Sequence, residues 1–352
     1  MSSHASATSP LSLVESVLNH ETPERTPVVP IVGLASAEYS GHSVRALLTD
    51  ADVQAKSLVS SLRRFNYDGV FTVMDLTMEV EALGGEVHVQ EKAPPYVAHP
   101  LTCDPSAILE IEPVSLSSGR IGVFTGAARR LVNEVGNSHL VSSYVIGPFT
   151  MAGQLIGLTK LLELTIDQES MTERVVKHCS HLVTPLIEMY GDIGVHNVVL
   201  LEPSASSSVM SPQYFMKYSM PYLTDCVRAI HETGARATVH VCGKAGQILS
   251  YMAQTGADIL SIDSPVDLVM ARTVVSRQCV LLGNVDTTLM LAGLPDAILQ
   301  SARRCIGDTG GNSFILSTGC DVPIGTPTRN IEALVRSVHA HTVGHSDTSK
   351  GH

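Results

Sequence analysis

The chain contains no tryptophan, and only 4% of its residues are aromatic. Because 44% of the residues are nevertheless hydrophobic, we expect a large core built mainly from aliphatic side chains. Positive charge is scarce as well, since 23 Lys and Arg face 34 Asp and Glu for a formal net charge of −11. This balance, and the lack of a clustered Lys/Arg stripe, argues against a nucleic-acid-binding surface.

Segments that would direct the chain into or across a membrane are also missing. The most apolar stretch, residues 144–166, is interrupted by glycine, proline and charged side chains, which predicts a buried strand, loop and helix. Residues 1–10 lack the charged and apolar regions of a signal peptide, and we expect them and residues 342–352 to be disordered. The seven scattered cysteines form a poor disulfide framework and indicate a reducing compartment, so the expected location is the cytoplasm.

Between these tails, strand-like and helix-like stretches alternate along one expected domain, residues 11–341. About eight strand–helix units can be counted, which is the number that closes an α/β barrel of the (β/α)8 TIM type. An open doubly wound sheet is the alternative, but no G-x-G-x-x-G follows the first strand. We expect strands at residues 28–32, 69–74, 139–146, 197–201, 237–241, 258–262, 279–282 and 313–316, with a small β excursion at 84–90. We expect helices at residues 11–20, 50–65 (with Asp50 as N-cap), 120–135, 167–193, 212–233, 247–255, 268–276, 295–306 and 331–341.

One of these strands ends in two potential metal ligands. Residues 237–241 are apolar and β-branched, and residues two apart on a strand point to the same face, so His240 and Cys242 should project together. An imidazole nitrogen and a thiolate sulfur suit zinc. Two ligands do not hold a metal alone, and the third candidate is Cys320, which follows another short apolar run at residues 314–316.

Polar residues also stand at the carboxyl ends of other predicted strands, and these ends share one mouth in a TIM barrel. They are Asp75, Glu202, Asp263, Asn284 and Asp286. Asp75 and Glu202 could instead cap the following helices, and Asp263 could be a fourth ligand, a substrate contact or a turn residue. Asn284 and Asp286 could shape a loop. The other cysteines are expected to be inert small hydrophobes, namely Cys103, Cys179, Cys226, Cys279 and Cys305.

Several of these segments together resemble the uroporphyrinogen decarboxylase superfamily, whose members are TIM barrels. The resemblance covers residues 11–341 and is most specific after Asn197. It rests on His240-Val-Cys242-Gly243 and on residues 75–84, 202–206, 211–215, 256–263, 282–286, 317–323 and 326–330.

Two branches of that superfamily lead to different expectations. Uroporphyrinogen decarboxylases carry an Arg-Gln-Ala-Gly-Arg segment near the first strand, whose arginines meet the substrate carboxylates. Here residues 30–39 contain no arginine and the next one is Arg45, so an octaanionic porphyrinogen would lose its charge partners. The zinc signature His-x-Cys with a distant Cys is similar to that of the methylcobamide methyltransferases, and it falls on His240, Cys242 and Cys320. Where that branch has an Asp before Pro, this chain has Glu202.

The resemblance therefore implies a zinc-dependent methyltransferase that moves a methyl group from a methylated corrinoid to a small-molecule acceptor, in the first place a thiol such as coenzyme M. It implies catalytic roles for Asp75, Glu202 and Asp263. A corrinoid protein is the expected partner, because no Asp-x-His-x-x-Gly cobalamin motif is present in this chain. The site would be completed by Asn284 and Asp286 as cofactor-binding residues.

Three alternatives stay open at this point. The acceptor could be tetrahydrofolate rather than a thiol. The protein could be a zinc-free decarboxylase or lyase of a smaller acid, held by Asp75. It could also bind zinc or corrinoid without catalysing a reaction.

Overall fold

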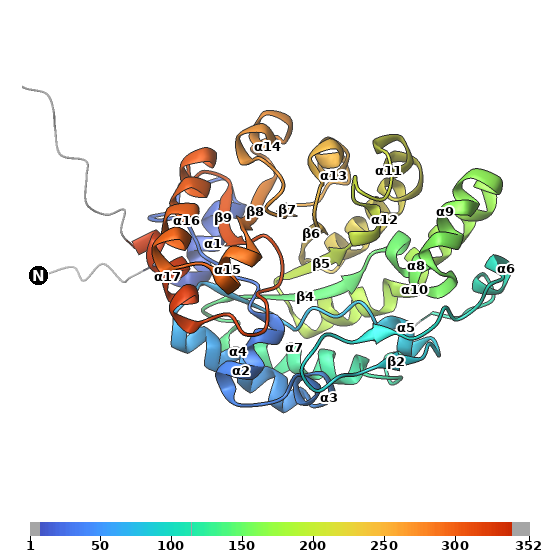
Figure 1. Cartoon of the computed structure of the whole chain (residues 1–352), viewed down its shortest axis with the longest axis horizontal. Coiled ribbons are helices and arrows are strands. Elements are labelled where there is room, and N and C mark those ends of the chain that lie inside the picture. The colour runs from blue at the N-terminus through green and yellow to red at the C-terminus, as the bar shows by residue number, and fades with distance from the viewer. Residues whose placement is uncertain (1–7, 114, 340–352) are drawn as a thin grey trace, which may run out of the picture.

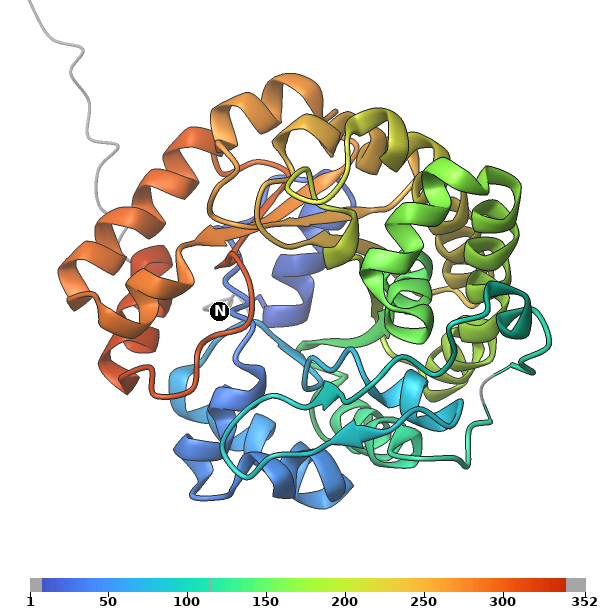
Figure 2. The ribbon, with the colours of Figure 1, turned by 45° about the vertical axis from the view of Figure 1, so that its right-hand side comes forward.

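The computed structural model describes residues 8–113 and 115–339. Parallel strands form its centre and helices surround them (Figures 1 and 2). Neighbouring strands follow the order β1-β4-β5-β6-β7-β8-β9, and every adjacent pair is parallel. These strands are β1 (Gly69–Phe71), β4 (Leu140–Ile146), β5 (Asn197–Leu201), β6 (Arg236–Val241), β7 (Ile259–Ile262), β8 (Val280–Val285) and β9 (Phe314–Thr318).

An extended segment after Pro27 closes the ring between β9 and β1. Val28 forms a parallel bridge with Leu316 of β9, and its carbonyl accepts a hydrogen bond of 2.8 Å from the Asp68 amide, next to β1. The segment was expected to be a strand over residues 28–32. It forms only a bridge, because prolines at positions 27 and 30 provide no N–H for a longer ladder. This segment takes the place of the eighth strand in the ring, and the predicted TIM barrel is confirmed.

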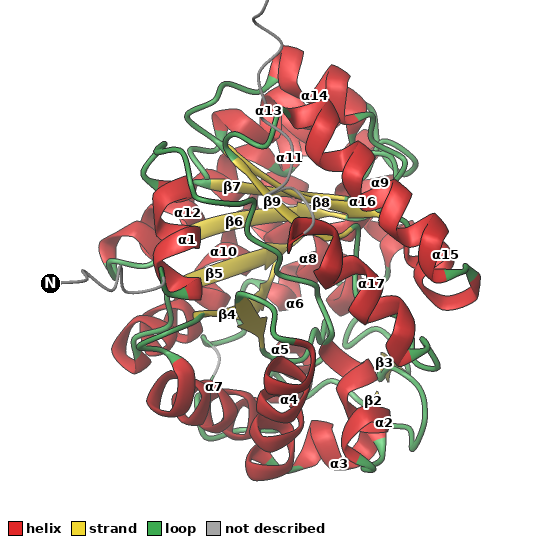
Figure 3. Ribbon diagram, turned by 90° about the vertical axis from the view of Figure 1, so that its left-hand side faces the viewer, coloured by secondary structure: helices red, strands yellow, loops and turns green. Residues whose placement is uncertain are grey.

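Helices cover the outside of the barrel, and short elements extend its carboxyl-terminal side (Figure 3). The helices that cover the outside are α4 (Ala51–Phe65), α7 (Ile121–Val135), α10 (Glu169–Ile193), α12 (Met220–Glu232), α13 (Leu249–Gln254), α14 (Leu268–Val274), α16 (Pro295–Thr309) and α17 (Thr328–His339). The additional elements are α2 (Ser36–Ser40), α3 (Val44–Thr49), α5 (Met78–Ala82), β2 (Val87–His88), β3 (Tyr96–Val97), α6 (Pro105–Ile108), α8 (Pro148–Ile156), α9 (Leu158–Asp167), α11 (Pro212–Tyr218) and α15 (Thr287–Ala292).

Local sequence signals explain where several helices begin and end. Asp50 caps α4 as predicted, because its carboxylate accepts the amides of Asp52 and Val53. The single helix expected at residues 212–233 is wrong. It is divided at Ser219 into α11 and α12, because Pro221 cannot donate the hydrogen bond that a continuous helix requires.

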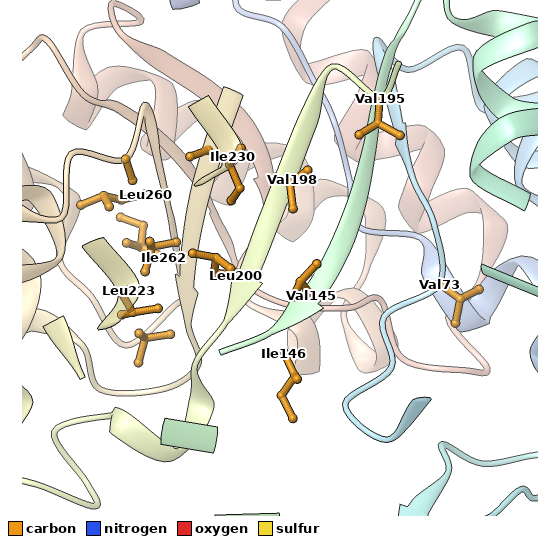
Figure 4. Close-up of a cluster of buried hydrophobic side chains, with 14 of the residues drawn as sticks. Val73, Val145, Ile146, Val195, Val198, Leu200, Leu223, Ile230, Leu260 and Ile262 are labelled. Atoms are coloured by element: carbon orange, nitrogen blue, oxygen red, sulfur yellow. The ribbon is translucent and has the colours of Figure 1, made fainter. Parts of the chain in front are cut away.

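Two buried clusters lie on opposite sides of the strands. The inner cluster fills the barrel with side chains such as Tyr144, and α1 (Pro10–Leu18) places Val14 and Val17 in the same cluster at the amino-terminal end. The outer cluster lies between strands and helices, and Figure 4 shows Val198 of β5 in this layer with Leu223 of α12. As predicted, both clusters are mostly aliphatic.

The predicted tails lie largely beyond the described part of the chain. Residues 1–7 and 340–352 are outside it, so the expectation for residues 342–352 is untested, and Pro10 belongs to α1. No helix within residues 8–113 and 115–339 is both long and apolar enough to cross a membrane.

A fully buried carboxyl group stands beside the turn between β4 and α8. Glu79 of α5 accepts a hydrogen bond of 2.8 Å from the Ile146 amide through Oε1, while its buried Oε2 has no partner among the described residues. Burial raises the pKa of Glu79 from 4.5 to about 8. The folded protein therefore holds a proton here at pH values where the unfolded chain has released it.

We predict that Glu79→Gln flattens the dependence of stability on pH. Between pH 4.5 and about 8 Glu79 is more protonated in the folded protein than in the unfolded chain, so its contribution to the free energy of unfolding falls as the pH rises. Glutamine keeps the acceptor oxygen and cannot ionise, so the free energy of unfolding of the variant should exceed that of wild type by about 4 kcal/mol at pH 8 and by about 1 kcal/mol at pH 5. Urea unfolding from pH 5 to 8 measures this, with exposed Glu112→Gln as control. Parallel curves for wild type and Glu79→Gln would contradict it.

Candidate metal centre

Three side chains from two distant segments meet at the carboxyl-terminal rim of the barrel. His240 is the penultimate residue of β6, and Cys242 follows that strand on the same face, with 2.9 Å between Nε2 and Sγ. Cys320 arrives from the loop after β9, where its Sγ lies 3.5 Å from Cys242 Sγ and 3.7 Å from His240 Nε2. The structure thus brings together the three residues that were predicted to be metal ligands.

The spacing of these donor atoms suits one small metal ion. In a tetrahedral zinc site, bonds of about 2.0 Å to nitrogen and about 2.3 Å to sulfur place the donors about 3.5–3.8 Å apart. Two of the three distances fall in or next to this range, and the Nε2–Sγ distance of 2.9 Å is shorter. His240 is buried whereas both cysteines are partly exposed, so the site is accessible from the cysteine side. Three protein ligands leave a fourth position for another molecule, as in catalytic zinc sites.

The electrostatics of the two thiols also favour a bound cation. The contact with Cys242 and then burial raise the pKa of Cys320 above its ordinary value. A divalent metal between the sulfurs acts in the opposite direction and ionises a coordinating thiol. Among the described residues this is the one His/Cys/Asp/Glu group with convergent donors. The other cysteines are unpaired thiols, and all except Cys103 are buried.

Ser261, which was not predicted from the sequence, contacts the imidazole of His240 and fixes its orientation. Ser261 of β7 pairs with His240 in the parallel register, and its Oγ lies 2.9 Å from His240 Nδ1. This contact occupies Nδ1 and leaves Nε2 for a metal. The signal was present in the sequence, because Ser261 is the single polar residue of an otherwise apolar strand.

Asp263 connects the two segments that carry the sulfurs. Its Oδ2 accepts a hydrogen bond of 2.8 Å from the Gly243 amide, and its Oδ1 accepts one of 2.6 Å from Ser264. A Cβ atom at Gly319 would lie 2.5 Å from Oδ1, so only glycine allows the loop before Cys320 to approach this closely. These contacts give Asp263 a positioning role. It is not among the converging donor atoms, and the catalytic role predicted for it stays a prediction.

Asn284 and Asp286 shape the neighbouring loop. The Asn284 amide donates to the carbonyls of Asp263 and Val266, at 3.2 and 2.7 Å. Asp286 caps α15 by accepting the Leu289 amide at 2.9 Å. Both line a cleft of about 430 Å³ beside α16. Their main hydrogen bonds are thus of the loop-shaping kind that was left open, and cofactor binding by them stays a prediction.

The carboxylates of Asp75 and Glu202 are engaged by other parts of the protein. Asp75 forms a buried ion pair with Arg120 and accepts the Thr77 amide at 2.6 Å. Glu202 accepts the Thr150 amide at 3.0 Å at the start of α8, and burial raises its pKa to about 8. The backbone amide of Glu202 donates a hydrogen bond of 2.9 Å to the His240 carbonyl. The catalytic roles expected for the two side chains stay predictions.

Two further buried polar groups were not found from the sequence, one in the inner cluster and one directly after Cys320. Tyr144 of β4 belongs to the inner cluster and stacks on Phe71, with ring centroids 5.6 Å apart and an interplanar angle of 19°. Its buried hydroxyl has no hydrogen-bond partner among the described residues. Oδ1 of Asp321, directly after Cys320, is likewise buried and unpartnered there. Gly33 makes room for this carboxylate, because a Cβ atom at that position would lie 2.1 Å from Oδ1.

We predict that Ser261→Ala weakens metal binding although it removes no ligand. Loss of the hydroxyl frees the His240 ring to rotate and to adopt the other tautomer, so affinity for zinc should fall about ten-fold or more. Competition with a chromophoric chelator measures this affinity. Ser143→Ala is the matched control, since Ser143 is a buried strand serine whose hydroxyl has no partner in the described structure. Equal zinc affinity in Ser261→Ala and wild type would refute the positioning role.

Comparison with known proteins gives relatives with the same overall layout. The chain is 24% identical over 323 residues to the methylcobamide:CoM methyltransferase MtbA of Methanosarcina acetivorans, covering 90% of this chain and 94% of the relative. It is 25% identical over 298 residues to the chloroplastic uroporphyrinogen decarboxylase 2 of Arabidopsis thaliana, covering 82% and 74%. A solved methyltransferase from Methanosarcina mazei superposes with a TM-score of 0.85 at 23% identity, covering 94% of this chain and 98% of that one.

The sequence model of one family spans nearly the whole described barrel. It is the model for uroporphyrinogen decarboxylase (URO-D), and it matches residues 9–341. The relatives include the methyltransferase branch that the His-x-Cys and Cys motifs indicated. The chain therefore belongs to the uroporphyrinogen decarboxylase (URO-D) family and resembles its methylcobamide methyltransferase branch.

Proposed function

We propose that this protein transfers a methyl group from a methylated corrinoid, carried by a separate protein, to a thiol acceptor. The observation that carries the proposal is the convergence of His240, Cys242 and Cys320 within 4.8 Å of one another. Relatives named for methyl transfer from methylcobamide to coenzyme M support it. The acceptor thiol would release its proton to solvent, the sulfur–methyl bond would form as the methyl–cobalt bond breaks, and the bonding electron pair would stay with the corrinoid.

The donor set fits zinc, and His240, Cys242 and Cys320 would hold it. When bound, zinc lowers the pKa of a coordinated thiol and keeps its sulfur nucleophilic at neutral pH. Ser261 orients the imidazole, and Asp263 fixes the distance between the two ligand segments through the Gly243 amide. The apolar inner cluster below the site excludes water from the side opposite the mouth.

The exposed side chains near the mouth suit a protein partner that presents the corrinoid. Helices α11 and α14 and the segment before α16 each follow the carboxyl-terminal side of a strand (Figure 1). They expose large apolar side chains, namely Tyr214, Met216, Val269 and Leu294. Exposed apolar groups beside a functional opening are typical of a docking surface.

Uroporphyrinogen decarboxylation is less well supported by the same site. Residues 30–39, which include the short 3-10 helix Gly33–Ala35 and most of α2, contain no arginine to pair with substrate carboxylates. A polyanionic porphyrinogen would therefore find no arginine partner at these residues.

We predict that Cys320→Ala loses both the metal and methyl transfer. Two remaining ligands cannot hold zinc tightly, so zinc content should drop from about one ion per chain to a small fraction. Methyl transfer from methylcobalamin to coenzyme M, followed by the corrinoid absorbance, should fall about 100-fold or more. Cys103→Ala, an exposed cysteine far from the cluster in sequence, is the control and should retain both.

Two outcomes of this experiment speak against the proposal. Equal zinc in Cys320→Ala and wild type would remove the ligand assignment. Methyl transfer by wild type to tetrahydrofolate but to no thiol would replace the acceptor class.

A further inference from the structure

The loop that carries Cys320 is hydrogen-bonded to the segment at residues 31–39. Residues 319–327 connect β9 to α17 without forming a helix or a strand. Three hydrogen bonds attach this loop to the segment: Val322 N to the Ile31 carbonyl at 2.7 Å, Gly325 N to Glu38 Oε2 at 2.7 Å, and Tyr39 Oη to the Thr326 carbonyl at 2.8 Å. The segment without arginine thus has a partner of its own, the loop of the third candidate ligand.

Two of these hydrogen bonds are made by side chains of α2, Glu38 and Tyr39. The Tyr39 ring packs edge-on against Phe65 of α4, with ring centroids 5.3 Å apart and an interplanar angle of 76°. Next to it, Ser40 Oγ lies 2.7 Å from Ser57 Oγ of α4. Helix α2 is therefore attached to a helix of the barrel wall, and the Tyr39 hydroxyl is fixed where it meets the loop.

Cys320 lies between two attachments of its loop. Before it, the Gly319 amide donates to the Val285 carbonyl of β8 at 2.8 Å. After it come the three hydrogen bonds to residues 31–39. The distances of 3.5 Å to Cys242 Sγ and 3.7 Å to His240 Nε2 therefore depend on backbone that is held on both sides of Cys320.

This attachment bears on metal affinity, because ordering a loop costs conformational entropy. His240 belongs to β6 and Cys242 follows it directly, so the sheet orders these two candidate ligands. Cys320 depends on its loop instead. If the loop is ordered before the metal arrives, the metal binds more tightly than if it has to order the loop itself.

We propose that Glu38 and Tyr39 are positioning residues of the candidate metal centre, which keep the loop of Cys320 ordered for zinc. The assignment rests on the zinc site of the proposed function. Neither side chain is among the converging donor atoms. Both act through residues 325–326 and the backbone that leads back to Cys320.

Removal of the two hydrogen-bonding groups tests the assignment. Glu38→Ala removes the carboxylate, and Tyr39→Phe removes only the hydroxyl. We expect the dissociation constant for zinc, measured by competition with a chromophoric chelator, to rise about three-fold in each variant and about ten-fold in the double variant. Glu38→Gln keeps an acceptor oxygen and should restore most of the wild-type affinity. The matched controls are Tyr218→Phe, which also removes a hydroxyl bound to a backbone carbonyl, and exposed Glu112→Ala; both should bind zinc like wild type.

A second background separates the positioning of Cys320 from a general loss of order. In Cys320→Ala the two remaining ligands bind zinc weakly, and the loop no longer provides a donor. Because Glu38 and Tyr39 act through this loop, their removal in the Cys320→Ala background should leave the residual zinc affinity unchanged.

The outcomes distinguish the positioning role from the reaction. Unchanged zinc affinity in the folded Glu38 and Tyr39 variants would overturn the positioning role and leave methyl transfer standing. An equal loss of affinity in the Cys320→Ala background would also overturn it, because the effect would not pass through the third ligand. A wild type that binds zinc but methylates no thiol would overturn the proposed function, and the affinities would still decide the positioning role. A wild type that binds no zinc would overturn both. If the double variant does not fold, Tyr39→Phe alone is judged by the same criteria.

Discussion

Closure of the parallel sheet is the constraint on which the candidate metal centre depends. Every strand of the ring points the same way, so residues after β6, β7 and β9 emerge at one rim although they are far apart in sequence. The Gly243 amide then binds the Asp263 carboxylate, and Gly319 lets the third segment come close to it. Backbone geometry, more than the ligands themselves, determines the spacing of the donor atoms.

The charges of the side chains at this rim determine which ligands can bind there. The net charge of the whole chain is −11, and the groups around the donors are carboxylates and thiols. Such groups favour the binding of a divalent cation. The absence of arginine from residues 30–39 distinguishes this rim from one that would hold a polycarboxylate substrate.

The convergence of the three candidate ligands could be predicted from the sequence because each stands at or just after the carboxyl end of a strand. His240 and Cys242 share a face by the period of a strand, and Cys320 follows another strand that ends at the same rim. Ser261 depends on the register between β6 and β7, which periodicity does not provide. Asp75 and Glu202 look equivalent to the ligands in sequence, but their side chains bind Arg120 and the start of α8. The direction of a side chain just after a strand depends on the loop, and a single sequence does not define that loop.

The extended segment at residues 28–31 is hydrogen-bonded to β9 and to the loop that follows it. The Val322 amide donates to the Ile31 carbonyl at 2.7 Å, two residues beyond Cys320, and Ser317 Oγ donates to the Val29 carbonyl at 2.7 Å. During synthesis, His240 and Cys242 leave the ribosome well before Cys320. At that stage the chain still lacks the sulfur of Cys320 and the strand β9 that precedes it. The three candidate donor atoms can therefore meet only late in biosynthesis, once residues 28–31 have paired with the segment around β9.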